Sequence, residues 1–251
     1  MDSPFSSPKA LHARAQAHIR EFSHKAHSQF LDRKPYLRAS EMNPHTREQL
    51  LKLRFTKEIP PELPCIAFDA INCLRSALDH SVYDASRVIK QADVRFTKFP
   101  VGKTRDEAEN EFSKPNRAID VPPCIRDYIL DFKPYKEGGN RLLWGLNEIR
   151  NAKIHRTLAP VGGIIDGLGI SNGYIGTMVT LSEWDAEKNE LTYASIQECR
   201  DLQLQVSVDI AFAQSTEMAR IPVIGALRDV SSIVASVIDG LEAETARILS
   251  S

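Results

Sequence analysis

The hydrophobic pattern of the chain changes its period near Leu158, and this change constrains the fold more than any other feature. Before this point apolar residues recur every three or four positions, which is the spacing along one face of an α-helix. After it apolar and polar residues alternate, as along a half-buried β-strand, and the alternation is clearest in Val206, Val208, Ile210 and Phe212. Helices, then strands, then a closing helix predict an α+β fold, with helices packed on one face of an antiparallel sheet.

The same patterns place the individual elements along the chain. We expect long helices at residues 9–31, 62–92, 141–156 and 222–249, and a short one after Pro122-Pro123. The expected strands are a hairpin at 36–41 and 49–56, followed by 158–166, 174–183, 190–196 and 203–213. Residues 93–121 are expected to be irregular, and Asp166-Gly167-Leu168-Gly169 is predicted to be a turn. We expect the hairpin and the later strands to share one sheet.

No stretch rich in Gly, Ser or Pro separates the helical and strand-rich parts. Residues 1–251 are therefore predicted to form a single α+β domain, large enough to bury a full core without disulfides. Within it we expect a flexible tail at 1–8, a mainly helical portion at 9–156 that contains the hairpin 36–56, a strand-rich portion at 157–220 and the closing helix.

Composition excludes several classes of function. A formal net charge of -1 provides no bulk field that would draw the chain onto nucleic acid or an anionic membrane. No apolar run reaches the roughly 18 residues of a membrane span, and the N-terminus lacks the apolar region of a signal peptide. The four cysteines lie far apart and form no C-x-x-C, so we expect reduced thiols in the cytoplasm. Phosphate-loop, dinucleotide and nucleophile-elbow motifs are missing from the sequence, so no cofactor is expected.

Two helical segments carry an unusual set of polar residues. The first runs from Arg75 to His80, and Asn72, Arg75 and Asp79 share one helix face through spacings of three and four. Five residues advance a helix by about 500°, so Arg75 and His80 diverge by roughly 140° and flank one edge. A polar stripe on a helix otherwise built for burial needs partners, so it is expected to face another polar surface, water or a ligand.

The second set runs from Arg150 to His155, with Arg156 adjacent, at the end of a later helix. Asn147 lies three residues before Arg150 on one face, and Asn151 lies four before His155 on the next. The spacing of Arg and His matches that of the first set. The negative end of the helix dipole favours cations here, which is itself a structural reason for this cluster.

Three interpretations of the two sets stay open from the residues alone. The polar side chains can form a self-satisfied buried network, or the same stripe can bind a partner, for example within a homodimer. The third interpretation is a catalytic site, in which Arg75, His80, Arg150 and His155 act together and Asn72, Asp79, Asn147, Asn151 and Arg156 support them. Both motifs fit a loose formula that occurs by chance in chains of this length, and their setting on helices beside Asn residues distinguishes them.

The pair resembles the Arg-x4-6-His signature of the HEPN superfamily, helical proteins that include metal-independent endoribonucleases. The segment 74–83 is also similar to a block of an uncharacterised bacterial family, and 147–156 to a second block. The second block departs from that family at Lys153 and Ile154, where Asp and Lys are usual. The resemblance implies RNA as a partner and cleavage by the ribose 2′-hydroxyl without a metal. A neutral His would take the proton, while Arg75 and Arg150 would hold the phosphate.

Overall fold

The computed structural model describes residues 3–153, 161–175, 177–197, 199–212 and 218–250. They form a mixed chain of helices and antiparallel strands that ends in a long helix, so the expected α+β class is confirmed. The described residues gather into two compact units. Unit 1 contains residues 3–21, 65–153 and 225–250, and unit 2 contains 22–64 together with the described residues of 161–224. The single domain spanning 1–251 stays a prediction.

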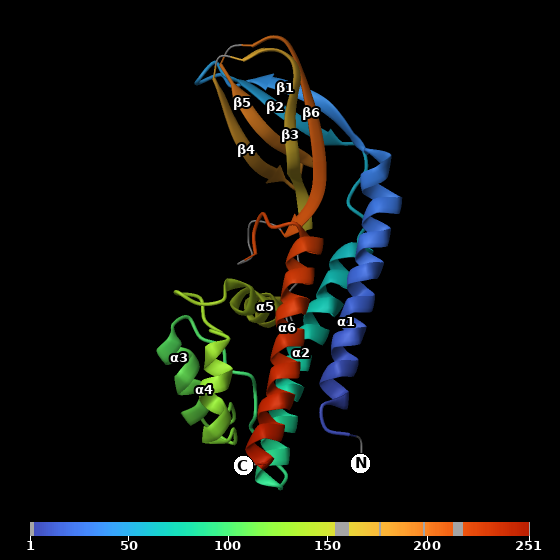
Figure 1. Cartoon of the computed structure of the whole chain (residues 1–251). Coiled ribbons are helices and arrows are strands. Elements are labelled where there is room, and N and C mark those ends of the chain that lie inside the picture. The colour runs from blue at the N-terminus through green and yellow to red at the C-terminus, as the bar shows by residue number, and fades with distance from the viewer. Residues whose placement is uncertain (1–2, 154–160, 176, 198, 213–217, 251) are drawn as a thin grey trace. The chain divides into compact units, whose positions relative to one another are not determined.

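Unit 1 is helical. Its helices are α1 (Ser6–Lys25), α2 (Glu62–Lys90), α3 (Arg105–Asn110), α4 (Pro123–Asp131), α5 (Arg141–Lys153) and α6 (Val223–Ser250). Three of them cross the boundary between the units: α1 belongs to unit 1 as far as Glu21, α2 from Cys65 onward and α6 from Gly225 onward. The long helices α1, α2 and α6 run alongside one another (Figure 1). Polar contacts tie α1 to α6, since Lys9 Nζ lies 2.5 Å from a Glu242 carboxylate oxygen and His12 Nε2 lies 2.9 Å from Ser231 Oγ.

The apolar stripe of α2 forms much of the core of unit 1. Leu74, Ala77, Leu78 and Val82 follow one another at helical spacing, and each is at most 1% exposed. Burying a leucine side chain contributes about 1.5–3 kcal/mol, and packing of this kind supplies most of the stability of a helix in a protein. The predicted inward face of residues 62–92 is therefore confirmed.

Short polar side chains fix where the smaller helices begin. Asn140 Oδ1 accepts hydrogen bonds from the backbone N–H groups of Leu142 and Leu143, at 3.1 and 3.2 Å, and so caps α5. Thr104 Oγ1 caps α3 by accepting from the N–H of Glu107 at 3.2 Å. Helix α3 and the 3₁₀ turn η3 (Glu111–Ser113) lie inside residues 93–121, which were expected to be irregular. That expectation is wrong for this part, because a side-chain cap stabilises a helix too short to show a hydrophobic period.

Unit 2 begins with helical turns and continues as strands. The turns are η1 (Ala26–Phe30) and η2 (Leu31–Arg33), and the strands are β1 (Tyr36–Met42), β2 (Gln49–Phe55), β3 (Val161–Ile175), β4 (Met178–Asp185), β5 (Glu190–Ile196) and β6 (Cys199–Phe212). The order β1-β2-β5-β4 makes one antiparallel sheet, and β3 pairs with β6 in a second. The single shared sheet expected from the sequence is wrong. Alternation predicts that a segment is a strand, but it carries no information about which strand is its neighbour.

The predicted turn at Asp166-Gly167-Leu168-Gly169 is also wrong, because these residues lie inside β3. The pairing of β3 with β6 shifts its register between Ile165 and Gly167, which leaves Asp166 outside the regular ladder. Glycine within a strand often marks such a bulge. The glycines therefore signal an irregularity within one long strand, and the segment predicted as strand 158–166 extends through Ile175.

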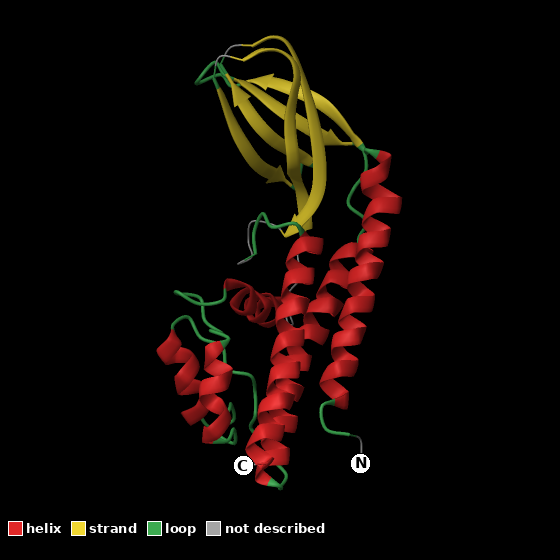
Figure 2. Ribbon diagram, in the orientation of Figure 1, coloured by secondary structure: helices red, strands yellow, loops and turns green. Residues whose placement is uncertain are grey.

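Aromatic rings fill the space between the two sheets of unit 2, which face each other in Figure 2. Phe55 stacks on Phe30 at a ring-centroid distance of 5.7 Å and meets Trp184 edge to face at 5.2 Å. A Cβ on Gly162 would lie 2.7 Å from the ring of Trp184, and one on Gly163 would lie 2.9 Å from that of Phe55. These two glycines therefore allow the rings to pack directly against the backbone of β3.

Candidate functional site

Arg75 lies on α2 and is only 4% exposed. Its guanidinium makes hydrogen bonds in three directions: Nη1 donates to Asp79 Oδ1 at 2.6 Å, Nη2 to the backbone carbonyl of Phe99 at 2.9 Å, and Nε to Asn147 Oδ1 at 3.3 Å. A guanidinium has five N–H donors in a fixed fork, and each of its three nitrogens is engaged here. Arg75 is thus held by the protein itself, with little of its surface left for a ligand.

Asp79 joins this arginine to the second motif. Its Oδ1 also accepts from the backbone N–H of Phe99 at 2.9 Å, and its Oδ2 lies 3.7 Å from Arg150 Nη1. The side chain of Arg150 is 29% exposed, and its buried Nε has no partner among the described residues. Burial lowers the pKa of Arg150, the charge of Arg75 lowers it further, and Asp79 opposes both effects. One carboxylate therefore serves two guanidinium groups.

Arg75, Asp79, Asn147 and Arg150 form a cluster that we call the α2–α5 network. Through it α2 and α5 contact each other by their polar side chains, Arg75 with Asn147 and Asp79 with Arg150. The network accounts for Arg75 and Asp79 on an otherwise apolar helix, because these two groups and Asn147 pair with one another, while Arg150 Nε stays unpaired among the described residues.

The other predicted site residues lie apart from the network or outside the described part of the chain. Asn72 is half-buried on α2, and Asn151 is exposed on α5. His155 and Arg156 fall among residues that the structure does not describe. His80 is exposed on α2, and its Nδ1 lies 2.8 Å from the hydroxyl of Ser7. The structure therefore brings together the two arginines of the motifs and places His80 in a different setting.

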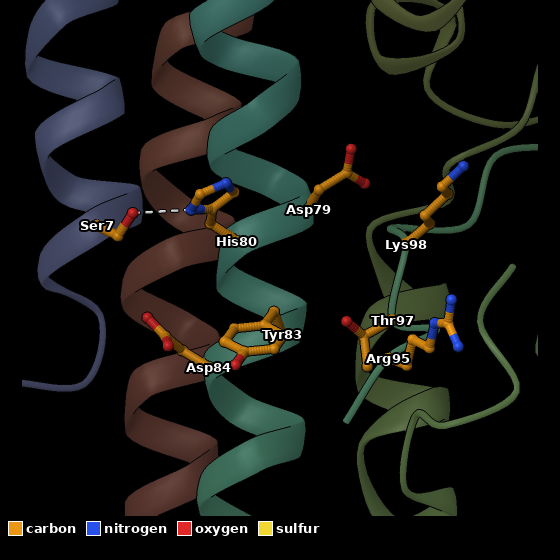
Figure 3. Close-up of a pocket in the computed structure, with 8 residues that line it drawn as sticks. All are labelled: Ser7, Asp79, His80, Tyr83, Asp84, Arg95, Thr97 and Lys98. Atoms are coloured by element: carbon orange, nitrogen blue, oxygen red, sulfur yellow. Dashed lines mark hydrogen bonds between the residues drawn. The ribbon is translucent and has the colours of Figure 1, made fainter. Parts of the chain in front are cut away.

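His80 lines a pocket of about 510 Å³ in unit 1 (Figure 3). The pocket lies between α2, the first turn of α1 and the segment that follows α2. Its surface is mostly carbon, and its lining residues are Ser7, Asp79, His80, Tyr83, Asp84, Arg95, Thr97 and Lys98. The imidazole and Tyr83 provide ring surface, and polar atoms of the lining side chains can direct a ligand.

The directions of these side chains determine which polar groups a ligand in the pocket can contact. In Figure 3 the hydroxyl of Thr97 points toward α2, whereas the cationic ends of Arg95 and Lys98 point away from it. Both carboxylates are already engaged: Asp79 in the α2–α5 network, and Asp84 by accepting from the backbone N–H of Phe5 at 2.9 Å. The other polar groups of the lining are the hydroxyls of Ser7 and Thr97, the Tyr83 phenol and the His80 ring, and of these Ser7 and His80 hydrogen-bond to each other.

The sequence did not point to Ser7, Thr97 or the other lining residues outside α2. Ser7 comes from the stretch predicted to be a flexible tail, but α1 begins at Ser6 and the neighbouring Phe5 is buried. Thr97 comes from the segment predicted to be irregular, and it is 6% exposed. Neither stretch has a period or motif that marks it, and only the folded chain brings them to α2.

Nothing in the described part of the chain groups three or more His, Cys, Asp or Glu side chains in a way that would hold a metal ion. The described helices include none with both the length and the apolar character needed to cross a bilayer. Comparison with protein-family models, with curated proteins and with solved structures finds no match. The proposals below therefore rest on the geometry of this chain.

Proposed function

We propose that this protein is a binding module that takes a small-molecule ligand in the pocket beside His80. The observation that carries the proposal is the pocket itself, whose volume of about 510 Å³ falls within the range of roughly 300–1,000 Å³ typical of ligand sites. A mostly apolar wall with a few directed polar groups is also the usual composition of such sites. The lining favours a ligand with an aromatic or aliphatic body and a few hydrogen-bonding groups.

The α2–α5 network adjoins this pocket through Asp79. Asp79 belongs to both, because its carboxylate lies in the network and its side chain lines the pocket. A buried charge cluster restrains the side chains that form it, since each has few alternative partners. On this account Arg75 and Arg150 keep the wall of the pocket in place, and the ligand contacts residues on its open side.

A fragment screen observed through the histidine rings tests this proposal. The full chain has seven histidines, so each ring can be followed by NMR. We expect binding fragments to shift the resonances of His80 and to lose affinity in Tyr83→Ala. His45, exposed in the loop between β1 and β2, provides the matched control, and His45→Ala should leave fragment affinity unchanged. Fragments that shift other histidines but never His80 would contradict the proposal.

Metal-independent RNA cleavage is the second candidate, and one observation favours it. The arginines of both Arg-x4-His motifs approach the same carboxylate, as the HEPN resemblance implies for a shared site. His80 is exposed, so its imidazole is accessible to an RNA strand, as a general base must be. Against this candidate, Arg75 is buried and fully engaged, which leaves Arg150 as the more accessible phosphate contact.

Incubation of the purified chain with total RNA in the presence of EDTA tests this second candidate. Cleavage that disappears in His80→Ala and in Arg150→Gln would support it, and EDTA should have no effect because the mechanism uses no metal. His45→Ala is again the control. RNA left intact by the wild-type chain would rule the candidate out while leaving the binding module untouched.

We propose that the protein is cytoplasmic. Cys73 and Cys124 carry free thiols, and burial raises the pKa of the Cys73 thiol. A reducing compartment keeps such thiols unpaired. Fractionation of cells that express the chain, followed by thiol labelling, checks this placement.

A further inference from the structure

Unit 2 contains a groove of about 560 Å³ that is separate from the pocket beside His80. One side of it is made by Lys34 and Arg38, which lie just before and within β1. The rest is made by Gly167, Leu168 and Gly169 of β3 and by Gln205, Val206 and Ser207 of β6. The glycines are those of the β3 segment that the sequence suggested was a turn.

The floor of the groove is bare backbone with two polar side chains beside it. Gly167 pairs with Ser207 and Gly169 with Gln205, so these four residues share one face of the β3–β6 ribbon. A Cβ at Gly167 would lie 2.7 Å from Ser207 Oγ, whereas one at Gly169 would meet only Gln205 Cβ at 3.8 Å. The groove is thus hollow above Gly169 because that residue lacks a side chain.

The charge of the groove is positive and unbalanced. Lys34 and Arg38 are both exposed, and neither makes an ion pair with any residue that the structure describes. The described residues that line the groove include no carboxylate. The backbone that bears the two cations is fixed, since the N–H of Lys34 donates to the carbonyl of Leu31 at 3.0 Å and the N–H of Tyr36 donates to the carbonyl of Lys34 at 2.7 Å.

We propose that this groove binds the phosphate groups of a small phosphorylated molecule. Two neighbouring cations complement the roughly double negative charge of a phosphate monoester, and the guanidinium fork of Arg38 fits phosphate oxygens in pairs. The hydroxyl of Ser207 donates only a long hydrogen bond of 3.4 Å, to the carbonyl of Gly167, so it can turn toward an anion instead. The amide of Gln205 adds further donors. The glycine floor lets the anion approach the strand closely.

Calorimetric titration of the full chain with inorganic pyrophosphate and with ADP tests the proposal. We expect saturable binding that weakens about tenfold in Arg38→Gln and in Lys34→Gln, the change that corresponds to one charge-assisted hydrogen bond, and further in the double variant. Gly169→Leu should abolish binding by filling the groove, while its melting temperature stays close to that of the wild type. Tighter binding of ADP than of pyrophosphate would identify a nucleotide as the carrier of the phosphates.

Lys57→Gln is the matched control, because Lys57 is an exposed cation of the same unit outside the groove. It should bind pyrophosphate as the wild type does. Equal weakening by Lys57→Gln and Arg38→Gln would mean that the anion senses only general surface charge, and this result would overturn the proposal. Wild-type protein that binds neither ligand, or Gly169→Leu that binds both normally, would overturn it as well.

Discussion

Two neighbouring faces of α2 place their polar residues in different settings, and only Asp79 reaches both. On one face Arg75 and Asp79 form a network with α5, in which Arg75 is 4% exposed and its guanidinium is engaged at each nitrogen. On the other face, His80 lies five positions after Arg75, is exposed, and lines a pocket together with hydroxyl groups. An Arg-x4-His motif on a helix therefore separates its two ends by more than a third of a turn. The same spacing that suggests one shared site can therefore place the arginine in a buried network and the histidine on the surface.

The largest effect should come from removing the carboxylate at the centre of the α2–α5 network. Asp79→Ala leaves the buried charge of Arg75 uncompensated, so we expect the free energy of unfolding to fall by about 3–5 kcal/mol. Urea denaturation followed by circular dichroism measures the loss. Asp84→Ala removes a carboxylate on the pocket side of the same helix, whose partners are the backbone N–H of Phe5 and, at 3.8 Å, Arg87. This change should lower the free energy of unfolding by less. Equal losses would contradict the division between the two faces.

The apolar core of α2 gives the next test. Leu78 is 1% exposed, and Leu78→Ala should lower the free energy of unfolding by about 2–5 kcal/mol through lost burial and a cavity. Arg14→Ala, at an exposed position of α1, should change it by less than about 0.5 kcal/mol. The same denaturation curves supply both values. A cost for Arg14→Ala that matches that of Leu78→Ala would mean that the inward face of the helix is misassigned.

A smaller effect is expected at the edge of the network. Asn147→Ala removes one neutral acceptor from Arg75, at 3.3 Å, while two of its partners remain. We expect a loss of about 1–2 kcal/mol, as for a single buried hydrogen bond. Asn151→Ala, at an exposed position of the same helix, is the control and should change stability little. If the two asparagine variants melt alike, Asn147 contributes nothing measurable to holding Arg75.

The sequence predicted the parts of the fold that local patterns encode. The stripe of Leu74 and Leu78 indicated the inward face of α2, and the alternation near Val206 indicated a strand, because side-chain burial repeats with the period of the element. The pairing of strands depends on contacts between distant residues, so the separate β3–β6 ribbon was missed. Gly167 was interpreted as a turn because glycine permits both a turn and a bulge.

The polar stripes on the two helices left open a buried network, a partner surface or a catalytic site. The structure joins Arg75 and Arg150 through Asp79, a contact between distant residues that no local pattern encodes. Whether a polar stripe is buried or open depends on what covers it, and the backbone of Phe99 covers Arg75. The pocket residues Ser7 and Thr97 come from stretches with no pattern, so only their tertiary placement shows their role.

The most direct test of the central claim compares Arg75→Gln with His80→Gln, a matched pair that replaces each end of the motif by the same neutral amide. The measurement is the free energy of unfolding of each variant in urea at neutral pH. We predict that Arg75→Gln loses about 3 kcal/mol or more, because Asp79 and the carbonyl of Phe99 lose a buried charged partner. His80→Gln should stay within about 0.5 kcal/mol of the wild type, because the ring is exposed. A His80→Gln variant as unstable as Arg75→Gln, or an Arg75→Gln variant as stable as the wild type, would contradict the claim that support and binding lie on different faces of α2.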